Sequence, residues 1–249
     1  MTEHKYKKSP IIEALCEVRF PSDNNWRINS FIKFANKAET LGFIDVVDAA
    51  EGFQIQFKFN EGMGDSNGTP PLLKPVSRRI QTWNKNKSLL WQASAELFAA
   101  NNRAPYLGWT KFKPHILKGL DVYSRIAQPK KAHTLALHYI NRIEFGTDES
   151  ALDYVRFCPP DIKYADSITN FLYHTQQTFN DGDMINISCT KDMESDKDRA
   201  VILNLLYVTN SPLLERVKIK QKLETAHNRI LTAFENTITE KQRLRMEEL

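Results

Sequence analysis

Residues 135–144, with the sequence LALHYINRIE, decide the fold of this chain. Two sets of side chains alternate along this stretch, which is the period of a strand with two unlike faces. One face carries Leu135, Leu137, Tyr139, Asn141 and Ile143, and the other carries His138, Arg142 and Glu144. The chain can be divided into two successive segments, which we call passes. Each pass has the order strand, helix, further strands and long helix, and residues 135–144 form the first strand of the second pass.

The first pass covers residues 1–131. An apolar strand over residues 11–20 is followed by Ser22 and Asp23, whose side-chain oxygens predict a helix start, and Gly42 predicts the helix end. Alternation of Phe with polar residues predicts a strand over residues 53–59. Residues 78–83 and 88–97 predict a hairpin, and apolar residues at helical spacing predict a long helix over residues 109–127.

The second pass covers residues 132–249. After the strand at residues 135–144, a short helix is expected at about residues 165–179. Residues 184–189 and 200–209 predict a hairpin whose acidic tip spans residues 192–198. A long helix is expected from about Leu213, and Thr239 with Gln242 has the spacing of a capping box that restarts it.

Together the two passes predict an α+β fold, with a curved, mainly antiparallel sheet and long helices packed across one face. Two similar β-α-β(n)-α halves, residues 1–131 and 132–249, would pack as one continuous unit, an architecture that resembles the TATA-binding-protein class. A duplication explains this order, and so does chance reuse of a simple order, because no residue motif repeats. The architecture alone does not fix a function.

Charge is divided unevenly between the two halves. Residues 1–131 carry 20 Lys and Arg against 12 Asp and Glu, whereas residues 132–249 carry 14 against 18. The basic first half offers clusters to nucleic-acid phosphates, but scattered lysines usually form a solvated surface. The contrast between the halves also suits a protein partner or self-association.

Composition indicates a cytoplasmic protein without a membrane span. The first eight residues are polar with no apolar segment after them, and no run approaches the roughly 20 apolar residues of a spanning helix. Cys16, Cys158 and Cys189 are odd in number and lie in or beside apolar stretches, which favours reduced, buried thiols over disulfides or a zinc site.

Three segments carry a resemblance to a known family. They are residues 9–14 (SPIIEA) with Arg19 and Phe20, residues 138–143 (HYINRI), and the spaced set Leu223, Ala226, His227, Ile230, Phe234, Ile238 and Thr239. In their order and separation they resemble an uncharacterised family of sporadically distributed prokaryotic proteins of about this length. His138 stands where that family has a basic residue. The resemblance implies no catalytic residues, and the patchy distribution is typical of defence or mobile-element systems.

Motifs for catalysis, cofactors or metals are weak in this chain. No glycine-rich phosphate loop, zinc-protease histidine pair or close cysteine pair is present. Asp45 or Asp48 followed by Gln56, Phe57 and Lys58 is similar to the metal site of some nucleases, although a half-exposed strand produces such a triplet routinely. Residues 192–198 have alternate carboxylates like a calcium loop, but lack its glycine and final glutamate. We therefore expect no catalytic residue, cofactor or metal.

Two interpretations compete for the polar residues of the central strand. Arg142 either closes an internal ion pair, with Glu144 as its neighbour, or reaches a partner. In the second case His138, Arg142 and Glu144 would share the polar face of one sheet with Gln54, Gln56 and Lys58, as a partner- or ligand-binding surface. His227, on the apolar stripe of the last helix, is expected to serve packing. The sequence thus favours a non-enzymatic binding or regulatory component of a prokaryotic system, with a metal-dependent nuclease and a nucleic-acid-binding protein as alternatives.

Overall fold

The computed structural model describes residues 6–49, 53–56, 72–75, 78–146, 148–157, 170–192, 199–210 and 216–247. In chain order the strands are β1 (Ile11–Arg19), β2 (Phe43–Ala49), β3 (Phe53–Gln56), β4 (Leu72–Pro75), β5 (Arg79–Asn84), β6 (Leu89–Ala93), β7 (Leu97–Arg103), β8 (Thr134–Glu144), β9 (Leu172–Thr178), β10 (Met184–Lys191) and β11 (Ala200–Val208). The helices are α1 (Ile28–Glu39), α2 (Trp109–Ala127), α3 (Arg216–Thr237) and α4 (Glu240–Glu247), with a short 3-10 helix at Ala151–Asp153.

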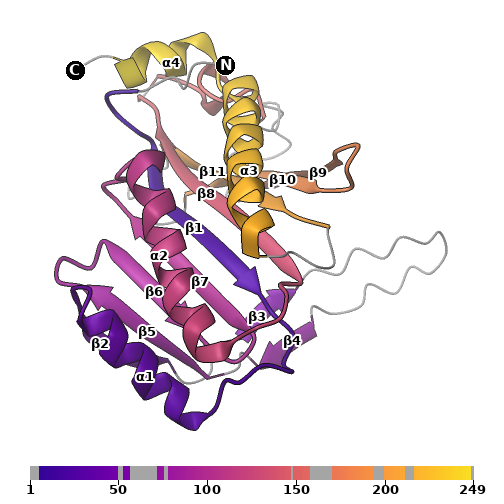
Figure 1. Cartoon of the computed structure of the whole chain (residues 1–249). Helices are drawn as coiled ribbons and strands as arrows, with labels where there is room; N and C mark the ends of the chain where they lie inside the picture. The colour runs from indigo at the N-terminus through magenta and orange to yellow at the C-terminus, as the bar shows by residue number, and fades with distance from the viewer. Residues whose placement is uncertain are drawn as a thin grey trace.

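Nine strands form one curved antiparallel sheet in the order β2-β5-β6-β7-β1-β8-β11-β10-β9. The long helices lie across one of its faces, α1 and α2 over the first half and α3 over β8 and β11 (Figure 1). The predicted α+β class is therefore confirmed. None of the helices in the described part of the chain is both long and apolar enough to cross a membrane.

The two central strands are the first strand of each pass. β1 pairs antiparallel with β8, with Cys16 opposite Leu137 and Val18 opposite Leu135. Residues before the boundary at 131 supply the five strands on one side of this seam, and residues after it supply the four on the other. In each half the chain leaves the centre for the sheet edge, returns strand by strand and ends in a long helix; a true duplication stays a prediction.

The core lies between the sheet and the helices. Alternate residues of β8 are buried, so Leu135, Leu137, Tyr139 and Ile143 face the helices as their spacing predicts. Gly119 of α2 permits the closest approach, because a Cβ there would lie 2.5 Å from the Phe98 ring. Because glycine has no side chain, α2 packs directly against β7 at this position.

Two predictions about elements are wrong, and three strands, β2, β4 and β7, were not predicted. Residues 172–178 form the edge strand β9 and not a helix, because their backbone pairs with β10, a contact between segments that local spacing does not reveal. The strand β2, which sequence reasoning missed, forms the opposite edge of the sheet. Helix α1 begins at Ile28 and not after Asp23, since the Asn24 side chain accepts from Trp26 N at 2.9 Å and donates to Pro21 O at 2.9 Å, which holds this segment in a turn.

Candidate functional site

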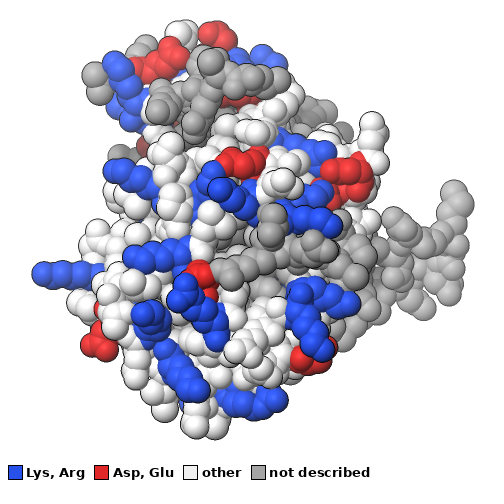
Figure 2. All heavy atoms as spheres, viewed as in Figure 1, with Lys and Arg blue, Asp and Glu red and all other residues white. Residues whose placement is uncertain are grey.

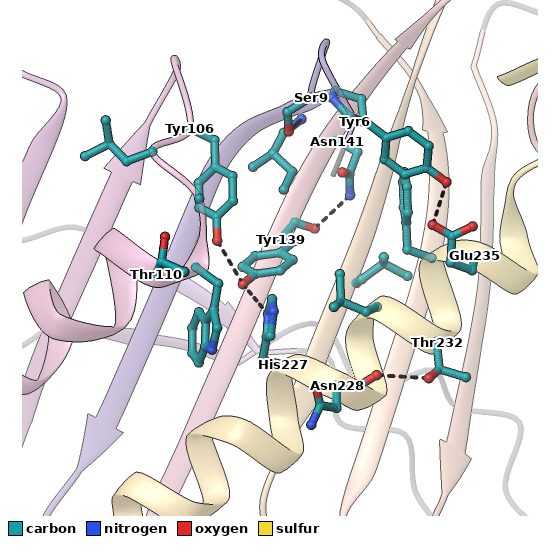
Figure 3. Close-up of a pocket in the computed structure, with 18 of the residues that line it drawn as sticks. Tyr6, Ser9, Tyr106, Thr110, Tyr139, Asn141, His227, Asn228, Thr232 and Glu235 are labelled. Carbon is teal, nitrogen blue, oxygen red and sulfur yellow. Dashed lines mark hydrogen bonds between the residues drawn. The ribbon is translucent and has the colours of Figure 1, made fainter. Parts of the chain in front are cut away.

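A pocket of about 950 Å³ opens between α3 and the loop that leads into α2, with strand β8 as its floor (Figure 3). Its lining comes from five separate parts of the chain. The lining residues are Tyr6, Ser9, Pro10, Ile11, Tyr106, Leu107, Gly108, Trp109, Thr110, Tyr139, Asn141, Leu205, Glu224, His227, Asn228, Leu231, Thr232, Phe234 and Glu235. The volume and the mixture of aromatic rings with a few polar groups are typical of small-molecule sites.

Local structure explains why these side chains converge. The period of two along β8 turns Tyr139 and Asn141 toward the helices, and Asn141 is 1% exposed although it stands in the apolar register. The fully buried Asn102 accepts a hydrogen bond from Leu107 N at 2.8 Å, which fixes the loop before α2. Gly108 then starts α2 with a φ of 83°, a conformation that favours glycine.

A chain of hydrogen bonds crosses the pocket floor. The hydroxyl groups of Tyr106 and Tyr139 are 3.1 Å apart, and the Tyr139 hydroxyl is 2.8 Å from His227 Nδ1. Figure 3 shows Tyr139 between the other two side chains. The Trp109 ring stacks on the His227 ring with centroids 4.2 Å apart. Burial lowers the pKa of His227 to about 4, so its imidazole is neutral at physiological pH.

Both carboxylates of the pocket have partners. Glu224 accepts hydrogen bonds from Trp109 Nε1 at 2.9 Å and from the Lys113 ammonium group. Burial acts to raise the pKa of Glu224, but these two donors outweigh it and hold the pKa below its ordinary value. Glu235 accepts from the Tyr6 hydroxyl at 2.7 Å and from Arg243 Nε at 2.9 Å. The negative charges of Glu224 and Glu235 are thus balanced by cationic side chains of the protein before any ligand binds.

The three polar residues predicted on β8 lie on the face of the sheet away from this pocket. Arg142 Nε donates to Asp192 Oδ2 at 2.6 Å, and its guanidinium group also contacts Glu144. The Asp192 side chain is only 8% exposed. Arg142 therefore belongs to an internal ion-pair group that contains Asp192 in addition to Glu144, the partner expected from the sequence. Burial lowers the pKa of His138 to about 4. A binding role for this face stays a prediction.

The predicted surface does not assemble in one sheet. Gln54 and Gln56 belong to β3, which pairs with β4 in a separate two-stranded sheet, and Lys58 lies outside the described residues. The expectation that these residues share a sheet face with His138, Arg142 and Glu144 is therefore wrong for the two glutamines. The alternation over residues 53–59 predicted a strand, but it contained no information about which sheet that strand joins.

The structure describes only some of the residues on which the nuclease alternative rests. The Asp45 carboxylate is engaged by the Lys87 ammonium group. Phe57 and most of the acidic segment 192–198 lie outside the described part of the chain, as does the Asp48 side chain. Within that part, no three His, Cys, Asp or Glu side chains lie close enough together to hold a metal ion.

Basic side chains are spread over the helix-covered face rather than gathered in one stripe. Figure 2 shows Lys and Arg outnumbering Asp and Glu on this face, with uncharged surface between many of them. Helix α1 contributes Lys33 and Lys37, and α2 contributes Lys111, Lys118 and Arg125. This distribution is typical of a solvated surface, and nucleic-acid binding through the basic half stays a prediction.

Sequence reasoning missed most of the pocket because it chose the opposite face of β8. The signal was Asn141, an amide in a register otherwise filled by Leu, Tyr and Ile. A buried amide in such a register needs hydrogen-bond partners, and Asn141 Nδ2 donates to Leu203 O at 3.1 Å. His227 does pack against the core, as expected, and it also lines the pocket. Searches against protein-family models, curated proteins and solved structures find no match to this chain.

Proposed function

We propose that this protein is a non-enzymatic binding or regulatory component of a prokaryotic system, and that its pocket binds a small, uncharged, aromatic or heteroaromatic molecule. The observation that supports this most is the pocket itself. Its lining combines aromatic rings with polar side chains that already form hydrogen bonds with other groups of the protein. A site built in this way recognises a ligand by shape and by a few hydrogen bonds.

The charges of the pocket favour an uncharged ligand. The lining contains neither Lys nor Arg, so the described walls offer an anionic group no cation of their own. Glu224 and Glu235 are held by Lys113 and Arg243, which lowers their attraction for a cationic ligand. Aromatic faces such as Tyr106 and Trp109 suit a planar ring, and side-chain amides such as Asn228 suit its polar substituents.

The protonation states favour recognition over acid–base catalysis. A general acid or base works best with a pKa near the operating pH. His227, with a pKa of about 4, is neutral throughout the physiological range, whereas the lowered pKa of Glu224 keeps that carboxylate ionised. Burial and the neighbouring Glu235 raise the pKa of Tyr6, so its hydroxyl keeps its proton. None of these groups is poised to exchange a proton at neutral pH.

A cytoplasmic location is part of this proposal. Cys16 is a buried free thiol and Cys189 is also buried, which suits a reducing compartment. The nuclease and nucleic-acid-binding hypotheses stay as alternatives. A cleavage assay on DNA and RNA with Mg²⁺ or Mn²⁺ tests the nuclease, and activity lost in Asp45→Ala or Lys58→Ala would favour it over the binding protein.

Nile red, an uncharged heteroaromatic dye whose emission rises in apolar surroundings, provides the direct test. We expect saturable binding with one dye per chain. Replacing the pocket residue Leu231 by Trp should weaken this binding at least about tenfold, because the larger ring occupies the cavity. The matched control is Leu244→Trp, at a side chain on α4 that is 52% exposed. Equal affinity in both variants, or no saturable binding by the unmodified protein, would contradict the proposal.

A further inference from the structure

The two edges of the nine-stranded sheet differ in how open they are to another strand. β2 forms one edge and β9 the other, on opposite sides of the molecule (Figure 1). An edge strand presents unpaired backbone N–H and C=O groups, and proteins usually prevent further pairing there with bulges, prolines or charged side chains. Comparing the two strands therefore shows which edge is available.

The β2 edge has two of these protections. Its register with β5 shifts between Phe43 and Asp45, which marks a bulge or irregularity in the ladder. Its sequence, FIDVVDA, also contains two acidic residues, Asp45 and Asp48. Charged residues along an edge strand disfavour its pairing with another strand.

The β9 edge has none of these protections. Its sequence, LYHTQQT, contains no proline and no Asp, Glu, Lys or Arg, and its register with β10 runs without a shift from Leu172 to Thr178. Most of its side chains are exposed, including Leu172 at 65% and Tyr173 at 43%. Among the described strands only β10 pairs with it. Its outer edge is thus a regular, uncharged template for another strand.

This edge is also held in place before any partner arrives. The β9–β10 turn contains Asp181 and Asp183, which bind Lys222 and Arg229 of α3. The guanidinium group of Arg229 lies 3.9 Å from the centre of the Phe179 ring, at the end of β9. A strand fixed in this way loses little conformational freedom when it pairs.

From these observations we propose that β9 pairs antiparallel with β9 of a second copy of this chain, so that the two sheets become one. With the twofold axis at Thr175, His174 of one copy faces Gln176 of the other, and Tyr173 faces Gln177. No like charges meet in this arrangement, because each of these pairs contains a glutamine. Pairing β9 with β2 of another copy would instead be a head-to-tail contact, which brings in the bulged, acidic edge and leaves the assembly open.

Charge reversal on β9 tests this pairing with the full chain. In solution the unmodified protein should have twice the chain mass of 28.8 kDa by light scattering. The double variant His174→Glu/Gln176→Glu places four carboxylates across the proposed junction and should raise the dimer dissociation constant at least about tenfold. The variant His174→Lys/Gln176→Lys should behave in the same way. An equimolar mixture of the two should restore a dimer with one copy of each.

The control is Val46→Glu, which adds a carboxylate to the β2 edge at a side chain that is 46% exposed and should leave the dimer intact. All of these positions are exposed, so thermal melts should confirm that each variant folds. A monomeric unmodified protein, a dimer that survives the four carboxylates, or a mixture that stays monomeric would overturn the proposal.

Discussion

Replacing Asp183 should destabilise the fold more than any other change to the charged groups beside α3. Its carboxylate is fully buried and accepts hydrogen bonds from Lys222 Nζ at 2.5 Å, from Asn210 N at 3.0 Å and from the Tyr207 hydroxyl. Arg229 Nη1 lies 3.4 Å away. One side chain thus joins the β9–β10 turn, β11 and α3.

The size of the effect follows from what the substitution leaves behind. In Asp183→Ala the cations of Lys222 and Arg229, whose side chains are 22% and 25% exposed, lose their buried partner, as does the Tyr207 hydroxyl. Removing one member of a buried ion pair costs about 3 to 5 kcal/mol of the free energy of unfolding. Asp183→Asn keeps the shape and removes the charge, so its cost should be smaller, about 1 to 3 kcal/mol.

Urea unfolding at pH 7, followed by circular dichroism, measures both variants. Asp23→Ala, at an exposed aspartate, is the matched control and should change stability by less than about 0.5 kcal/mol. A loss below about 1 kcal/mol for Asp183→Ala would refute the reasoning, because it would mean that Lys222 and Arg229 find equivalent partners without it.

The neighbouring Asp181 adds a pH dependence with a defined sign. Its hydrogen bonds with Arg229 lower the pKa of Asp181 from 3.8 to about 2. A carboxylate whose pKa is lower in the folded state stabilises the fold fully above its unfolded pKa and loses that contribution as the pH falls through the folded pKa. The stability difference between the unmodified protein and Asp181→Asn should therefore be present at pH 7 and shrink between about pH 4 and pH 2. A difference that is constant over this range would contradict the assignment.

Three further predictions concern packing and the sheet face opposite the helices. Arg142→Ala should cost about 2 kcal/mol in denaturant melts, because it leaves the carboxylate of Asp192 buried while Arg142 itself is one-third exposed; an unchanged midpoint would favour a partner-binding role. Gly119→Ala should cost about 1 to 3 kcal/mol, since the added methyl group overlaps the rings of Phe98 and Trp91, and a neutral effect would show that α2 has room to shift. Phe234→Ala should cost about 3 to 5 kcal/mol by the same measurement, and a loss below about 1 kcal/mol would mean that this face of α3 contributes little to the core.

The sequence correctly predicted the elements in which the spacing of the apolar residues matches the pattern of buried residues. Strand β8 alternates strictly and is buried on alternate residues, and the apolar stripe of α3 through Leu223, Ile230 and Phe234 is buried as expected. Strand β9 shows no such pattern because most of its residues are exposed, and a helix was expected there from the sequence. What makes it a strand is its pairing with β10, a tertiary contact that overrides local preference.

The pocket was harder to predict than the fold for a geometric reason. Tyr6, Tyr106, Tyr139 and His227 come from the N-terminal segment, the loop before α2, strand β8 and helix α3, and only the folded chain brings them together. Tyr139 was assigned to the buried face of its strand correctly, but a buried tyrosine gives no sign that a cavity adjoins it.

The indole N–H signals in a ¹H–¹⁵N NMR spectrum test the central claim most directly. Trp109 Nε1 donates to Glu224 at the pocket wall, whereas the buried indoles of Trp26 and Trp91 lie outside the pocket lining and serve as internal controls. When Nile red is added, the Trp109 indole signal should shift in proportion to the occupied fraction while the Trp26 and Trp91 signals stay in place. A Trp109 signal that does not move when dye binds, or equal shifts of all three, would contradict binding in this pocket.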